Sequence, residues 1–244
     1  MSEEIFEIEN GVLLNYNGED IADVVVPEGV REIGEYAFFD CDGLRSITFP
    51  KGVIKINESA VSDCNDLETV YLPETLEDFE MAFYECVSLK QAVLAEGITE
   101  ISNNAFYFCT SLRSVNFPKS LKRIGDFAFA SCYALESADL PEGLLEIGEG
   151  AFISCDSLFK INIPRGVTKI HGATFNGCSG LKEATVPVGV KEMGSDVFFA
   201  TGNKDLVVYC EAEEKPEGWH KNWDVCSGLI FKKRLKVVWG FKSE

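Results

Sequence analysis

A cysteine recurs at an almost constant interval through most of the chain, and this repeat constrains the fold more than any other feature. Successive gaps are 23, 22, 23, 23, 23 and 23 residues, between Cys41, Cys64, Cys86, Cys109, Cys132, Cys155 and Cys178. A proline, replaced once by Ala95, keeps the same spacing nine residues after each cysteine. A unit this short cannot bury its own apolar residues, so the repeat predicts a solenoid in which each unit stacks on the next.

Within each unit the pattern predicts a strand followed by a tight turn. It reads Leu-x-x-Ile-x-Phe-Pro, then x-x-Val-x-x-Ile-Gly-x-x-Ala-Phe-x-x-Cys. Apolar residues two apart, such as Ile161 and Ile163, are typical of a short strand with one buried face. The Ala-Phe-x-x-Cys segment suits one helical turn. One residue is deleted within the stretch Glu77–Phe83.

The strand Leu158–Pro164 and the turn Ile147–Cys155 resemble the BspA-type leucine-rich repeat, a bacterial branch of the leucine-rich repeat superfamily. The resemblance covers about eight repeats of 23 residues over residues 21–200. It implies an α/β solenoid with a parallel β-sheet on its concave face and short helical or 3-10 turns on the other side. Each strand would then lie about 4.8 Å from the next.

Both ends of the chain differ from the repeats and predict caps within one continuous domain. Residues 1–20 resemble the opening β-hairpin of the family, and Asn10-Gly11 is a strong two-residue turn signal. Residues 201–244 resemble an irregular or β C-terminal cap, into which Leu229–Lys236 is inserted. This cap holds 8 basic and 7 acidic residues. Its basic cluster is interpreted as a charged strand edge or, alternatively, as a docking site for an acidic partner, and comprises Lys232, Lys233, Arg234 and Lys236.

The cysteines are interpreted as packing residues. One small side chain per unit, flanked by core positions, is typical of buried free thiols. Stacked units point these side chains in parallel, which disfavours disulfides, and Cys210 with Cys226 is the favoured pair if any forms. No Cys-x-x-Cys motif is present, so no cofactor or zinc is expected. The acidic stretches Asp40–Gly43 and Asp63–Asp66 lack the spacing of a calcium loop and fit turn chemistry.

Charged residues form columns along the predicted stack. Directly after each proline position the sign alternates, with one slip, through Glu28, Lys51, Glu74, Glu96, Lys119, Glu142 and Arg165. Five places after each proline position it alternates in the same way, through Glu32, Lys55, Asp78, Glu100, Arg123, Glu146, Lys169 and Glu192. Stacked opposite charges contribute roughly 0.2–1 kcal/mol per pair. We interpret the columns as structural, although duplication of a two-repeat unit would leave the same trace. The slip adjoins the deleted residue, so weaker stacking is expected from Pro73 to Glu100.

The formal net charge of -18 makes nucleic acids and anionic membranes poor partners. The start of the chain, Met-Ser-Glu-Glu-Ile-Phe, lacks the basic and apolar regions of a signal peptide. No apolar run approaches the length of a membrane span. The sequence as it stands therefore predicts a cytoplasmic monomer, or a cell-surface or secreted protein if a leader has been removed.

The strand residues that point away from the core would line the concave face, which is the usual binding surface of a solenoid. The predicted contacts are Ser46, Thr48, Thr69, Tyr71, Gln91, Ser114, Asn116, Asp139 and Asn162. Tyr71 is the best single contact because aromatic anchors dominate protein interfaces. A solvated sheet face is the alternative interpretation for each of them.

Catalysis has little support in the sequence. His171 replaces the glycine of a repeat turn, and His220 lies among the tryptophans of the cap. Neither accompanies a recognisable nucleophile motif. We therefore expect a non-catalytic interaction module that binds a protein or glycan, and the resemblance implies a surface or secreted adhesin. An intracellular scaffold is the alternative, and an enzyme with a site near His171 or His220 is a remote one.

Overall fold

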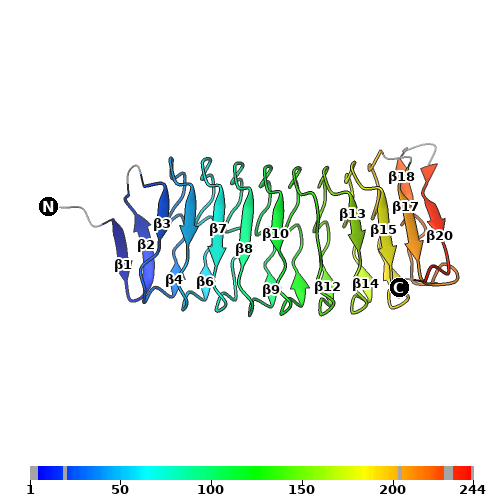
Figure 1. The fold of residues 1–244 in the computed structure, drawn as a ribbon, viewed down its shortest axis with the longest axis horizontal. Coiled ribbons are helices and arrows are strands. Elements are labelled where there is room, and N and C mark those ends of the chain that lie inside the picture. The colour runs from blue at the N-terminus through cyan, green and yellow to red at the C-terminus, as the bar shows by residue number, and fades with distance from the viewer. Residues whose placement is uncertain (1–4, 19–20, 203–204, 228–232, 243–244) are drawn as a thin grey trace.

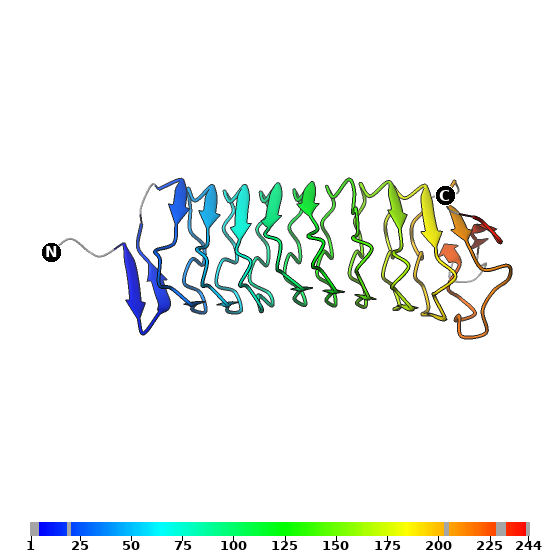
Figure 2. The ribbon, with the colours of Figure 1, turned by 60° about the horizontal axis from the view of Figure 1, so that its bottom comes forward.

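Twenty short strands follow one another along the chain in the computed structural model, which describes residues 5–18, 21–202, 205–227 and 233–242. They form an elongated stack of coils in chain order, with a hairpin at one end and a cap at the other (Figure 1). The stack shows little curvature in two views (Figures 1 and 2), so the predicted concavity is slight. None of the described segments is a helix that could span a membrane.

The N-terminal hairpin is confirmed. Strands β1 (Phe6–Glu9) and β2 (Val12–Tyr16) pair in antiparallel fashion. Asn10 and Gly11, with φ of 51° and 81°, make the turn, since a two-residue hairpin loop of this type needs positive φ at both positions. Strand β2 also pairs in parallel with β4 (Glu32–Ile33). The hairpin therefore begins the stack and covers its first coil.

Long strands form one side of the stack, in two parallel sheets separated by a gap. The first sheet contains β3 (Asp23–Val25), β5 (Ser46–Thr48), β7 (Thr69–Leu72), β8 (Gln91–Leu94) and β10 (Ser114–Asn116). The second contains β13 (Lys160–Asn162), β15 (Glu183–Val186), β17 (Val207–Cys210) and β20 (Lys236–Val238). The coil between them, at residues 137–140, has no strand. We call this side of the stack the long-strand face.

Short strands of two residues form a second side. After β4 and β6 (Lys55–Ile56) comes an interruption, followed by β9 (Glu100–Ile101), β11 (Arg123–Ile124), β12 (Glu146–Ile147), β14 (Lys169–Ile170) and β16 (Glu192–Met193). In the cap, β18 (Val225–Ser227) pairs with β19 (Lys233–Arg234).

The short-strand interruption falls at the deleted residue. Asp78 there makes only an isolated bridge with Lys55, and the Oγ atom of Ser102 accepts the Phe79 N–H at 3.0 Å.

The predicted helical or 3-10 turns are wrong. In the first coil Tyr36 and Asp40 have φ of 60° and 55°, and the two matching positions of every later coil are also left-handed. Their left-handed backbone stops each coil from continuing as a helix beyond a single turn. The N–H groups of Phe38 and Asp40 then donate to Ala60 and Ser62 of the next coil, at 2.7 and 3.1 Å. We call this part of each coil the turn segment; it exchanges helical hydrogen bonds for bonds between coils.

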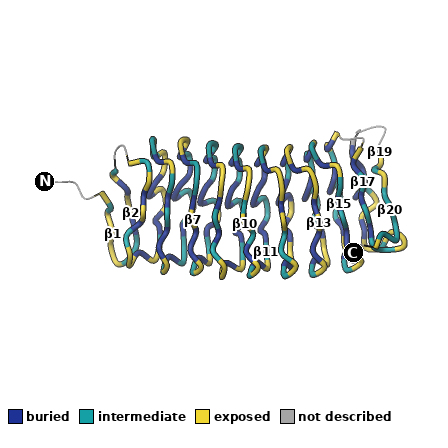
Figure 3. The backbone as a smooth tube through the Cα atoms, viewed as in Figure 1, coloured by how far each residue is buried: buried dark blue, intermediate teal, exposed yellow. Residues whose placement is uncertain are grey.

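One continuous core runs through the stack, with buried residues in every coil (Figure 3). Its centre is a column of parallel rings whose centroids lie 5.4–5.7 Å apart, formed by Phe83, Phe106, Phe129, Phe152, Phe175 and Phe198. Trp223 of the cap closes the column edge-on against Phe198, at 6.4 Å. Each ring therefore contacts only the neighbouring coils.

The cysteine column packs as predicted and also bonds the coils together. Each thiol donates to a backbone carbonyl of the preceding coil at 2.9–3.3 Å, from Cys64, Cys86, Cys109, Cys132, Cys155 and Cys178. All nine cysteines are free, and Cys41, which begins the column, is only half-buried. Burial raises the pKa of Cys178 to about 12, so its thiol stays protonated at neutral pH.

Candidate functional site

The register of the first long-strand sheet brings seven of the nine predicted contacts together. Ser46, Thr69, Gln91 and Ser114 occupy one row of partners across β5, β7, β8 and β10. Thr48, Tyr71, Val93 and Asn116 occupy the next row. Tyr71 is 43% exposed and stands between Thr48 and Val93. The face is thus a polar surface with one aromatic side chain near its middle.

Two of these side chains are already engaged within the protein. The hydroxyl of Ser46 donates to the Oδ1 atom of Asp23 at 2.6 Å. The amide of Asn116 donates to the Leu94 carbonyl and accepts the Leu94 N–H, both at 2.8 Å. Asn116 thus takes the place of a backbone partner at the edge of the first sheet. Its hydrogen-bonding groups serve the stack, and its role as a partner contact stays a prediction.

The other two predicted residues lie apart from this group. Asp139 is exposed within the coil that separates the two sheets. Asn162 lies on β13, in register with Thr185 and Tyr209 of the second sheet. The sequence pattern treats all coils alike, whereas the structure divides the predicted face at residues 137–140. Asn162 belongs with the C-terminal part of the face.

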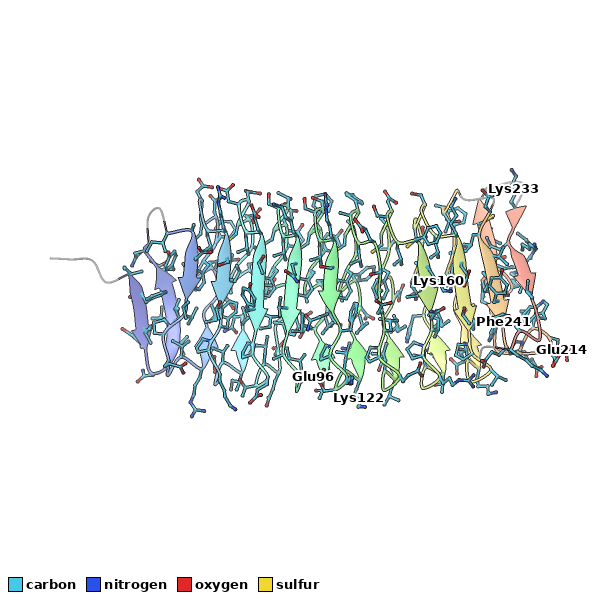
Figure 4. All side chains as sticks on the ribbon, viewed as in Figure 1. Glu96, Lys122, Lys160, Glu214, Lys233 and Phe241 are labelled. Carbon is cyan, nitrogen blue, oxygen red and sulfur yellow. The ribbon has the colours of Figure 1, made fainter. Side chains whose placement is uncertain are left out.

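A cavity of about 340 Å³ opens on that C-terminal part, between the second sheet and the cap. Its lining includes Lys160, Asn162 and Thr185 from the sheet, and Phe241 from the cap. Lys160 and Phe241 are labelled near this end of the stack in Figure 4. The cavity thus continues the polar sheet face and adds an aromatic wall at its end.

Four of the five charged side chains that line this cavity form ion pairs, and the fifth, Glu142, has none among the described residues. Lys160 forms an ion pair with Glu183, and the Nη2 atom of Arg165 lies 2.7 Å from the Oε1 atom of Glu211. The other carboxylate oxygen of Glu211 accepts the Val188 N–H at 3.1 Å. Each pair is neutral and Glu142 adds one negative charge to the lining, so the cavity favours an uncharged polar group over a free anion.

The arrangement favours binding and offers little for catalysis. Neither histidine lines the cavity. The backbone carbonyl of His171 accepts the Thr174 hydroxyl at 2.8 Å, and the Nδ1 atom of His220 accepts the Asn222 N–H at 3.2 Å. In the ranges that the structure describes, no three His, Cys, Asp or Glu residues are placed to hold a metal ion.

Several cavity residues were missed by sequence reasoning. Arg165 and Glu142 belong to charge columns that were interpreted as structural. Phe241 follows the closing motif of the cap, and only the return of the cap against the second sheet brings it to the cavity. Its signal in the sequence was limited to an aromatic residue after a cap motif, which does not predict a position on the sheet face.

Ion pairs confirm the structural interpretation of the charge columns. The Nζ atoms of Lys55 and Lys169 lie 3.6 and 3.5 Å from carboxylate oxygens of Asp78 and Glu192. Arg123 pairs with Glu100 on one side and Glu146 on the other. These charges join neighbouring coils, and they are not free for a ligand.

The basic cluster of the cap is partly internal. Arg234 pairs with Asp224 and donates to the Lys221 carbonyl at 3.2 Å. Lys233 and Lys236 are exposed on β19 and β20, whereas residues 229–232 of the inserted segment, Lys232 among them, lie outside the described residues. Cys226, the favoured disulfide partner of Cys210, is free and donates to the Lys233 carbonyl at 3.4 Å.

Comparison with known proteins gives one family and several similar structures. The profile of the BspA type Leucine rich repeat region matches six copies, over residues 14–107 and 78–204. The crystal structure of a leucine rich repeat protein from T. pallidum has a TM-score of 0.59 and 28% identity, and the match covers 84% of this chain and 90% of that chain.

Two further matches are more distant. A leucine rich cell surface protein from Faecalibacterium prausnitzii has a TM-score of 0.48 and 19% identity, with 88% of this chain and 75% of that chain covered. The pneumococcal vaccine antigen PcpA has a TM-score of 0.49 and 17% identity, with 81% of this chain and 64% of that chain covered. No curated protein matches the chain.

Proposed function

Because the chain belongs to the family of BspA-type leucine-rich repeat proteins, we propose that it is a non-catalytic module that binds a protein or glycan partner through its long-strand face. Proteins built from such repeats are generally interaction modules, and a solenoid sheet face is their usual binding surface. The proposal rests on one observation above all. Polar side chains of β5, β7, β8 and β10 lie in register around Tyr71, and beyond the gap at residues 137–140 the same face carries the cavity beside the cap.

The chemistry of this face points to a polar, uncharged ligand. Hydroxyl and amide groups on the first sheet supply hydrogen-bond donors and acceptors without net charge. At the cavity, Asn162 and Thr185 offer the same groups beside the ring of Phe241. A glycan chain or a polar peptide segment presents matching hydroxyl or amide groups together with apolar C–H surface. The net charge of -18 keeps nucleic acids away from such a site.

The binding test compares matched variants on arrays of glycans and extracellular matrix proteins. We expect Tyr71→Ala and Asn162→Ala to lose the strongest signal of the wild-type protein. Leu145→Ala removes a similarly exposed apolar side chain from the short-strand side and should keep the signal. An array signal that survives both long-strand variants would show that another surface carries the binding.

The location of the protein in its cell distinguishes an adhesin at the cell surface from an intracellular scaffold. Adhesion is the role that the family resemblance implies, whereas nine free cysteines favour the scaffold because reducing compartments keep thiols unpaired. Protease treatment of intact cells of the native organism, followed by blotting, distinguishes the two. Loss of the protein supports adhesion. A protected protein that fractionates with cytosol supports the scaffold, and its partner is then sought in lysate.

A further inference from the structure

One column of the turn segment stacks acidic residues on one another. The second left-handed position carries Asp40, Asp63 and Glu85 in three consecutive coils. The Asp40 N–H donates to the carbonyl of Ser62, next to Asp63, and the Asp63 N–H donates to the carbonyl of Tyr84, next to Glu85, each at 3.1 Å. Among the ion pairs of the described residues, none involves these three carboxylates. Three like charges are thus stacked without a cation between them.

This stacking is unfavourable for the isolated protein. Burial raises the pKa of Asp63, and the charges of Glu85 and Asp40 raise it further. Like charges directly opposite one another on neighbouring strands destabilise a sheet, and the same Coulomb repulsion acts between neighbouring coils. In the column through Lys55, Arg123 and Lys169, by contrast, opposite signs on neighbouring coils form ion pairs. A cation from outside the chain would relieve the repulsion between Asp63 and Glu85.

Aromatic side chains continue this column along the same side of the stack. Tyr84 and Tyr107 are stacked with centroids 5.4 Å apart, and Tyr107 lies 6.4 Å from Phe108. Phe108 meets Tyr133 edge-on at 5.9 Å. Tyr133 is 38% exposed, and the other three rings are half-buried, so ring surface remains open to solvent. Tyr84 lies in the coil of Glu85, Tyr107 and Phe108 lie in the next coil, and Tyr133 lies in the coil after that.

We propose that the strip formed by Asp63, Glu85, Tyr84, Tyr107, Phe108 and Tyr133 is a second binding surface, which takes an arginine-containing cationic segment of a partner protein. A guanidinium group pairs with carboxylates through its fork of donors and stacks flat on aromatic rings. The strip offers both contacts side by side. It crosses three coil spacings, about 14 Å, which an extended peptide of roughly five residues spans.

Charge complementarity selects this partner. The acidic surface attracts cationic segments over long range, and the strip supplies short-range contacts that a uniformly charged surface lacks. Ammonium groups of lysine pair with the carboxylates but stack less well on the rings. Preference for arginine over lysine is therefore the signature that separates the strip from the general acidity of the protein.

The test measures binding of fluorescein-labelled hexa-arginine and hexa-lysine to the full chain by fluorescence anisotropy at low and at physiological ionic strength. We expect hexa-arginine to bind more tightly. The double variant Asp63→Asn/Glu85→Gln should weaken its binding roughly tenfold, since each surface ion pair contributes up to about 1 kcal/mol and 1.4 kcal/mol is tenfold. The control Glu77→Gln/Glu149→Gln removes the same charge from exposed positions elsewhere and should change affinity less than about twofold.

The rings are tested separately. Tyr107→Leu/Phe108→Leu should abolish the preference for arginine while charge-driven binding persists. Tyr133→Ser, at the exposed end of the strip, should reduce the preference for arginine in part. Thermal unfolding checks each fold, and Asp63→Asn/Glu85→Gln should be at least as stable as wild type because repulsion is relieved. Equal weakening by the two carboxylate variants, equal affinity for the two peptides, or no binding would each overturn the proposal. Tyr71→Ala leaves this surface intact, so a failure of the binding proposed for the long-strand face can be distinguished from a failure of arginine binding here.

Discussion

The thiol of Cys109 donates a hydrogen bond to the carbonyl oxygen of Phe83, 26 residues earlier in the chain, with an Sγ–O distance of 3.1 Å. Among the described residues the same carbonyl receives one other backbone bond, a long one of 3.4 Å from the Cys86 N–H. The cysteine of each coil therefore fills volume in the core and also satisfies a buried acceptor in the coil before it. A small apolar residue does only the first of these.

Replacing this cysteine by alanine should weaken the stack. Cys109→Ala leaves the Phe83 carbonyl under-bonded, and we expect a loss of about 1 to 2 kcal/mol in the free energy of unfolding. Cys109→Ser restores a donor and should recover part of the loss. Urea unfolding measures both. Cys41→Ala is the matched control, because Cys41 is half-buried at the start of the column, and its effect should be smaller. An equal loss at the two positions would argue against the role of the hydrogen bond.

The buried thiols predict that the protein loses stability in alkaline solution. Burial raises the pKa of Cys178 to about 12, and the pKa values of the other buried column thiols are raised too, whereas an unfolded thiol titrates near 8.5. Between these pH values the unfolded chain releases protons that the folded chain keeps. Stability is therefore full below about pH 8.5 and falls above it by about 1.4 kcal/mol per pH unit for each such thiol.

Urea midpoints measured with a reductant from pH 7 to pH 10 test this dependence. The decline should be shallower in Cys109→Ala once its lower starting stability is subtracted, because one titrating thiol has been removed. A profile that stays level up to pH 10 would contradict the expected ionisation of the unfolded chain.

The left-handed turn residues offer a stabilising substitution. Ser131 has a φ of 60°, and Gly177 fills the same position two coils later. Left-handed backbone is unfavourable for a residue with a Cβ atom by roughly 1–2 kcal/mol, partly offset by the larger chain entropy of unfolded glycine. Ser131→Gly should thus raise the melting temperature slightly. Ala134→Gly, close by but outside the left-handed region, should lower it by the usual penalty for glycine.

The coil with the deleted residue should open more readily than its neighbours. The Phe79 N–H bonds a side-chain hydroxyl, Ser102 Oγ, where the regular coils continue the short-strand ladder. Ser102→Ala leaves this buried N–H without its partner and should cost about 1–3 kcal/mol, whereas Ser88→Ala should be nearly neutral. Amide hydrogen exchange at residues 78–80 should exceed that at residues 123–125. Equal protection at the two sites would show that the hydroxyl replaces the ladder fully.

Much of the fold follows from the sequence because spacing and turn chemistry act locally. The 23-residue interval predicts the stack, and Asn10-Gly11 predicts the hairpin that begins it. The left-handed turn segments were not predictable in this way, since side chains as bulky as Tyr36 and Phe108 occupy them. Bonds to the next coil stabilise that backbone, and those bonds exist only once the coils are stacked.

The candidate site was predicted less completely. The alternation of each strand places Tyr71 and its neighbours on one face, as expected. The gap at residues 137–140 has no comparable signal, because Ala138 fills a core position that Ala92 also fills in a regular strand. The position of Phe241 depends on how the cap returns against β15 and β17, which is a tertiary property.

The column of stacked phenylalanines, in which each ring touches only the coils on either side, also determines how the molecule responds to tension. A force applied between the two ends acts on the coils in series, so the load reaches every interface and the outermost one has the fewest neighbours. Coils should then peel away singly, each releasing 23 residues and lengthening the chain by about 75 Å. Such a stack yields stepwise under strain, as an extensible spacer rather than a brittle rod.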